Sequence, residues 1–112
     1  MDRRRRSRIP LRAGHALQAT IAAPNRRPRV VDVLNVGPTG MLFEYPCLAP
    51  LLGVGTRVLA RLRLGKTVVT LPAVTRHQNG GRYGLRFESD SRALHKIVAA
   101  LEAQWLTARK AV

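Results

Sequence analysis

The hydrophobic and polar positions between residues 15 and 88 alternate with a period of two. In the segment 56–64, the even positions from 58 to 64 are Val, Ala, Leu and Leu, whereas three of the four odd positions from 57 to 63 are Arg. This alternation is typical of a strand with one face in the core and the other in water. Turns rich in Gly, Pro and Asn separate it from similar segments. The pattern predicts six strands, at 15–22, 29–36, 41–45, 56–64, 66–77 and 82–88.

The period changes after residue 90. Ser89-Asp90-Ser91 offers good N-cap residues, and apolar residues then recur at helical spacing at positions 94, 97, 98, 101 and 105. We therefore predict one amphipathic helix over 91–109, which either closes the barrel or forms a dimer face. Six short, regularly spaced strands favour a closed barrel, because closure removes exposed strand edges. The predicted fold is all-β, a six-stranded antiparallel barrel with a C-terminal helix.

The first twelve residues differ from the rest. They carry six arginines, and such a density of like charge repels itself. We predict a flexible arginine-rich arm at 1–12, followed by a single domain at 13–112. At 112 residues the chain has room for one domain.

The whole chain is strongly basic. It carries 20 Lys and Arg against 6 Asp and Glu, a net charge of +14. This excess indicates an acidic partner, such as a nucleotide, a nucleic acid, an anionic lipid or an acidic protein surface. The single cysteine, Cys47, excludes a disulfide within the chain and a zinc site built on several thiolates. Without a long apolar run or a signal peptide, we expect no membrane span and a cytoplasmic location.

Catalytic chemistry is poorly supported by the residues. His15, His77 and His95 lie far apart on different predicted elements, with no carboxylate pair at metal-ligand spacing. The sequence has neither a glycine-rich phosphate loop followed by GK[ST] nor a nucleophile elbow. We therefore expect a binding protein rather than an enzyme, with no metal and no cofactor.

Two motifs stand out together. One is the R-x-x-x-R arrangement Arg4-Arg5-Arg6-Ser7-Arg8, and the other is the small-residue turn at 35–40, Asn-Val-Gly-Pro-Thr-Gly. With the glycine at 55 before a long strand, the Tyr-Gly-Leu-Arg-Phe strand at 83–87 and the closing helix, they resemble the PilZ family. PilZ domains are receptors for the bacterial second messenger cyclic di-GMP. The resemblance runs over nearly the whole chain.

The resemblance implies a ligand site. Arg4 and Arg8 would be the motif arginines, since Arg pairs bidentately with phosphate or with the O6/N7 edge of guanine. Asn35 would contact guanine, and Gly40 would let the backbone turn tightly beside the ligand. Arg5, Arg76 and His77 are further candidate contacts. The full set of predicted ligand-binding residues is Arg4, Arg5, Arg8, Asn35, Gly37, Gly40, Arg76 and His77.

One position departs from the family pattern. Gly37 stands where the family's turn, [DN]-x-S-x-x-G, has a serine. Losing one hydroxyl hydrogen bond costs about 0.5–1.5 kcal/mol, roughly a factor of 2–12 in affinity. We expect binding to be weakened rather than abolished.

The predicted function is a cyclic di-GMP receptor or adaptor whose N-terminal arm orders on the ligand and signals to a downstream protein effector. One alternative is a degenerate PilZ adaptor that binds no nucleotide and acts through protein contacts alone; Gly37 favours it. Another is a basic nucleic-acid-binding module, supported by the charge of +14. Aromatic residues make up only 4% of the chain, which leaves few stacking platforms for single strands.

Overall fold

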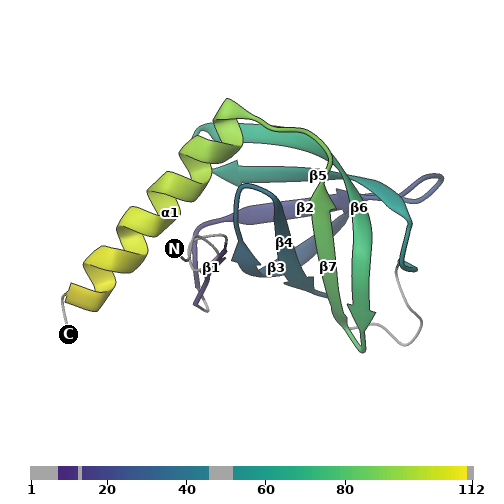
Figure 1. The fold of residues 1–112 in the computed structure, drawn as a ribbon, viewed down its shortest axis with the longest axis horizontal. Coiled ribbons are helices and arrows are strands. Elements are labelled where there is room, and N and C mark those ends of the chain that lie inside the picture. The colour runs from purple at the N-terminus through teal and green to yellow at the C-terminus, as the bar shows by residue number, and fades with distance from the viewer. Residues whose placement is uncertain (1–7, 13, 46–51, 111–112) are drawn as a thin grey trace, which may run out of the picture.

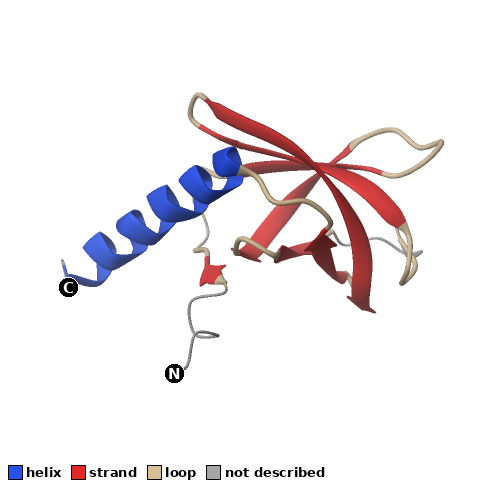
Figure 2. Cartoon of the chain, turned by 45° about the horizontal axis from the view of Figure 1, so that its top comes forward, coloured by secondary structure: helices blue, strands red, loops and turns tan. Residues whose placement is uncertain are grey.

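The computed structural model describes residues 8–12, 14–45 and 52–110. Its strands close into an antiparallel barrel with one helix at its side (Figure 1, Figure 2). The barrel strands follow the order β3-β2-β5-β6-β7-β4, and the pairing of β4 with β3 closes the ring. The predicted fold class is therefore confirmed. The strands are β2 Gln18–Ala22, β3 Arg29–Val36, β4 Gly40–Glu44, β5 Arg57–Leu64, β6 Thr67–Asn79 and β7 Arg82–Phe87, and the helix is α1 Arg92–Lys110.

A further short strand, β1 Ile9–Pro10, precedes the six. It pairs with the end of β3, where Ile9 lies opposite Val36. One edge of β3 therefore has two partners: its first three residues pair with β2, and its last two pair with β1. Ile9 is buried, and the Leu11 N–H donates to the Leu34 carbonyl. The sheet therefore begins inside the segment 1–12 that we predicted as one arm, because an apolar side chain there reaches the core.

The predicted core faces match the observed burial. On β5, Val58, Ala60 and Leu62 point inward, while the residues between them are exposed. Strand β2 starts at Gln18 rather than at residue 15, because a hydrogen bond from the His15 N–H to the Arg12 carbonyl forms a turn there. The helix lies against β6, β5 and β1. Its buried residues are Leu94, Ile97, Val98 and Leu101, and Trp105 is half-buried beside them.

The helix begins where the sequence predicted a cap. The Ser91 hydroxyl accepts a hydrogen bond from the Leu94 N–H at 3.3 Å, which satisfies one of the free donors of the first turn. Asp90 accepts from the Ser91 N–H and from the His95 ring at 2.7 Å. Both hydrogen bonds favour the ionised carboxyl, so the pKa of Asp90 lies below its usual value.

Two β-bulges interrupt the ladders. On β3, Val33 lies opposite Phe43 and Asn35 opposite Leu42, which makes Leu34 an extra residue. On β6, Thr75 lies opposite Leu85 and His77 opposite Gly84, which makes Arg76 an extra residue. An extra residue shifts the side-chain alternation by one position for the rest of the strand. Both bulges lie near the cavity described below.

The described residues contain neither a membrane-spanning helix nor a cluster of metal ligands. None of the helices there is long and apolar enough to cross a membrane. None of the His, Cys, Asp and Glu side chains in residues 8–12, 14–45 and 52–110 gather in a group of three that would hold a metal ion.

Candidate functional site

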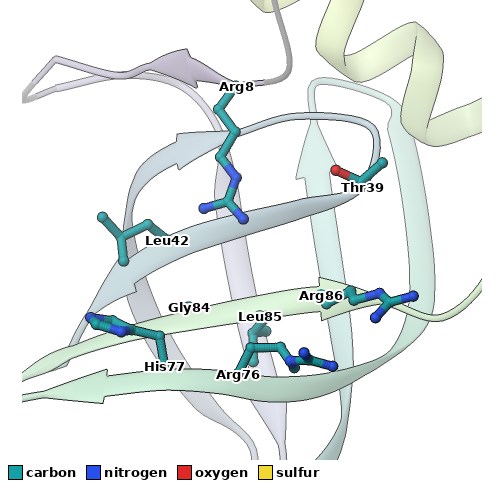
Figure 3. Close-up of a pocket in the computed structure, with 8 residues that line it drawn as sticks. All are labelled: Arg8, Thr39, Leu42, Arg76, His77, Gly84, Leu85 and Arg86. Atoms are coloured by element: carbon teal, nitrogen blue, oxygen red, sulfur yellow. The ribbon is translucent and has the colours of Figure 1, made fainter. Parts of the chain in front are cut away.

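An open cavity of about 350 Å³ lies on the outer surface of the barrel, between β1 and the β6–β7 pair (Figure 3). Arg8, just before β1, reaches over it from one side in Figure 3, and Arg76 and Arg86 lie on the other. Residues from four separate stretches of the chain therefore build it. Its lining is Arg8, Thr39, Leu42, Arg76, His77, Gly84, Leu85 and Arg86.

The floor of the cavity follows from the strand register. Asn35, Leu42, Gly84 and His77 lie opposite one another in turn across β3, β4, β7 and β6. Met41 and Phe43 on β4 and Tyr83 and Leu85 on β7 are buried, so Leu42 and Gly84 between them face outward, and the row does too. Gly84 contributes no side chain to the row, and a Cβ placed on it would lie 3.1 Å from the Cβ of His77. The row is therefore hollow at its centre.

The two bulges decide which residues reach this surface. Val31 and Val33 are buried two positions apart, and the next buried residue of β3 is Val36. If Leu34 were paired normally and β3 had no bulge, Asn35 would continue the inward alternation of Val31 and Val33. The bulge at Arg76 has the same effect on β6, where Leu71, Ala73 and Thr75 are buried and His77 is exposed. Bulges thus turn two polar side chains out of the core, a use common next to binding sites.

Arg8 is held close to the predicted turn. Its Nη1 donates to Asn35 Oδ1 at a long 3.5 Å. A Cβ on Gly40 would lie 3.1 Å from Arg8 Nη2 and only 2.3 Å from the carbonyl oxygen of Leu85. Gly40 is the first residue of β4 and pairs with Arg86 on β7. It permits close approach of β4 to β7 and of Arg8 to the turn.

The cavity has a strongly positive lining. It has three arginines and no acidic residue. Within the described part of the chain, neither Arg76 nor Arg86 forms an ion pair, whereas Glu44 and Glu88 pair with other arginines. Asp32 and Asp90 lie beside the rings of His15 and His95. Guanidinium groups with free donors on an open concave surface are suited to an anion.

The predicted site residues fall into three groups. Arg8, Arg76 and His77 line the cavity, and Asn35 bonds to Arg8 at its edge. Gly37 and Gly40 frame the β3–β4 turn, in which the Gly37 N–H donates to the Gly40 carbonyl at 2.9 Å. Arg4 and Arg5 lie outside the described residues.

Other residues that line the cavity were not predicted from the sequence. Arg86 was read only as part of the Tyr-Gly-Leu-Arg-Phe strand, and Leu42 and Gly84 were not singled out. The alternation of β7 does carry the signal for Arg86, because it lies between the inward-facing Leu85 and Phe87. Knowing that Arg86 lies beside Arg76 also requires the β6–β7 register, which residue types alone do not give.

Comparison with known proteins decides the family. A family model described as the PilZ domain matches residues 2–103. The chain belongs to the PilZ family. Membership in this family supports a cyclic di-GMP-binding domain at the level of the family, whose members are binding or adaptor domains rather than enzymes.

Solved structures agree on the fold of this PilZ domain. The PilZ domain of CeSA from a cellulose-synthesizing bacterium superposes with a TM-score of 0.66 at 21% identity, covering 85% of this chain and 97% of that one. An uncharacterized Legionella protein superposes with a TM-score of 0.60 at 13% identity, covering 92% and 97%. No curated protein matches this chain. At these identities the likeness concerns the barrel and its helix.

Proposed function

We propose that this PilZ domain binds cyclic di-GMP in the arginine-lined cavity and passes the signal to a protein partner. The observation that carries the proposal is the arrangement of Arg8, Arg76 and Arg86 around one hollow without an acidic neighbour. The family match adds the ligand class.

Each side chain has a chemical task in this proposal. Arg8 presents its planar fork to phosphate or to the O6/N7 edge of guanine, and Asn35 stands beside it as an amide partner for the base. Arg76 and Arg86 supply charge for phosphate, and His77 offers a ring on the same surface. A volume of about 350 Å³ is at the lower end of the range for small-ligand pockets. The arginines that precede Arg8 would therefore enclose the rest of the ligand.

The arm is the expected source of the conformational signal. Arg4 is four residues before Arg8 and so within about 14 Å of it along an extended chain. We propose that Arg4 and Arg5 close on the ligand and change the surface offered to the partner. Limited trypsin digestion with and without cyclic di-GMP tests this step. Protection of the bonds after Arg4 and Arg5 by the ligand is expected, and equal cleavage rates contradict arm closure.

Calorimetric titration of cyclic di-GMP at physiological salt tests the binding itself, with GTP as the control ligand. We expect saturable binding that Arg8→Ala weakens about tenfold or more, since a good bidentate arginine contact contributes roughly 1–3 kcal/mol. Arg61→Ala is the matched control, because it removes an equally charged, exposed arginine from β5, outside the cavity lining. Its affinity should stay within about twofold of the parent, allowing for the lost charge.

The alternatives give different results. Absence of heat and of thermal stabilisation by cyclic di-GMP would favour the degenerate adaptor that Gly37 suggests. Binding to oligonucleotides with a steep salt dependence, and without preference for cyclic di-GMP, would favour a nucleic-acid-binding module.

A further inference from the structure

A second hollow lies on the outer surface, where β2, β5 and β6 run side by side. Its volume is about 360 Å³. Its lining is Ala22, Ala23, Pro24, Arg57, Val58, Leu59, Pro72 and Glu88. Most of these side chains are apolar, in contrast to the arginine-lined cavity.

The register explains both the hollow and its apolar character. Leu59 lies opposite Ala22 on β2 and opposite Pro72 on β6. Its side chain faces outward and is 51% exposed, flanked by two short ones. A large exposed leucine between small neighbours offers an apolar contact for an inserted side chain. The concave shape suits a protruding side chain of a protein better than the flat surface of a bilayer.

Arginines lie along one side of the hollow, on β5, and Arg57 is part of its lining. Arg57, Arg61 and Arg63 are the other outward residues of β5. Glu88 is the one acidic residue in the lining, and it pairs with Arg57 at 3.7 Å. The Arg57 side chain is still 77% exposed, so its remaining donors are free for a partner. The electrostatic complement of this rim is an acidic segment.

The hollow adjoins the proposed nucleotide site. Along β6, Pro72 lines the hollow and Arg76 lines the cavity, and Val74 lies between them. On the neighbouring strand, Arg86 lines the cavity and Glu88, two residues on, lines the hollow. A partner seated in the hollow would therefore lie beside a nucleotide bound in the cavity.

We propose that this hollow docks an acidic protein segment that inserts a large apolar side chain beside Leu59. The role of this partner as the effector rests on the proposed function, whereas the docking chemistry does not. Apolar anchoring in a pocket with a charged rim is how protein interfaces concentrate their binding energy and select partners.

Selection of a random twelve-residue peptide library against the immobilised whole chain tests the docking surface. Enriched peptides, labelled with fluorescein and titrated by anisotropy, should combine several acidic residues with at least one large apolar residue. Leu59→Asp should weaken their binding at least tenfold. Val68→Asp is the matched control: Val68 is also an exposed apolar strand residue, 41% exposed, but lies outside the hollow. It should change affinity less than twofold.

The outcomes separate this proposal from the nucleotide site. Enriched peptides without acidic residues, or peptides that bind the Leu59→Asp variant as well as the parent, would overturn it. Sedimentation with phosphatidylglycerol vesicles that depends on Leu59, with no peptide enriched, would also overturn it in favour of a lipid surface. Arg8→Ala should retain peptide binding, and Leu59→Asp should retain cyclic di-GMP binding. Failure of the nucleotide titration therefore leaves the peptide result intact.

Discussion

At the residue scale, Gly40 shows how one position serves both the fold and the site. The family motif leads one to expect a glycine there for a tight turn, but the closest constraint comes from a strand more than forty residues away. A side chain on Gly40 would collide with the carbonyl oxygen of Leu85 at 2.3 Å and crowd Arg8. The sequence motif singles out Gly40, whereas the space around it is set by the pairing of β4 with β7, which the motif does not contain.

Replacing Gly40 by alanine should therefore destabilise the domain. Relief of the contact requires the backbone of β4 or β7 to move, so we expect a loss of about 1–3 kcal/mol in the free energy of unfolding. Urea denaturation followed by circular dichroism measures it. Gly53→Ala is the control, since among the described residues the nearest atom to its added Cβ is Thr56 Oγ1 at an ordinary 3.9 Å. Equal midpoints for the two variants would contradict the proposed clash.

At the element scale, the start of α1 was predictable because a cap depends on neighbours in the sequence. Ser91 was among the expected cap residues, and its hydroxyl accepts from the Leu94 N–H. Ser91→Ala should lower the free energy of unfolding by about 1 kcal/mol. Ser89→Ala, an exposed serine just before the cap, should leave it within about 0.5 kcal/mol of the parent. A larger loss for Ser89 than for Ser91 would mean that the cap is misassigned.

The same terminus predicts a pH dependence. The hydrogen bond from His95, followed by that from the Ser91 N–H, lowers the pKa of Asp90 below 3.8 in the folded chain. The ionised carboxyl therefore adds stability that is present above pH 3.8 and is lost as the pH falls through the lowered pKa. Relative to Asp90→Asn, the parent should be more stable near neutrality, and the difference should shrink in acid. Urea titrations at stepped pH measure this, and a difference constant down to acid pH would exclude Asp90 as its source.

The strands illustrate which part of the fold and site sequence alone can give. The alternation of polar and apolar residues in β5 was sufficient to predict which of its side chains face the core. The six barrel strands were predicted with small errors at their ends. The bulges were not predicted, since they are defined by the partner strand. On β3 a trace is visible afterwards, because the spacing of Val31, Val33 and Val36 changes from two to three. Placing Arg86 beside Arg76 needed this cross-strand information as well.

At the scale of the whole molecule, the charge of +14 opposes compactness. Added salt screens this repulsion, with a Debye length of about 10 Å at 0.1 M. We expect the melting temperature in a low-salt buffer to rise on addition of NaCl, as measured by scanning calorimetry. The double variant Arg26→Glu/Arg27→Glu, which lowers the net charge by four, should show a shallower rise. Equal slopes for the two proteins would show that salt acts by another route than the net charge.

The paired bulges also bear on how this barrel tolerates change during evolution. Two solved structures with this fold are only 21% and 13% identical to the chain, so very different sequences are compatible with the architecture. Insertion or removal of one residue within a paired strand is a different kind of event, because it shifts the side-chain alternation by one position along the strand unless a bulge absorbs it. Leu34 and Arg76 are the extra residues of two such bulges, and the bulges keep Asn35 and His77 on the outer face. Strand length near the cavity should consequently be under tighter selection than residue type. Insertions and deletions should accumulate in the loops and be rare in β3 and β6.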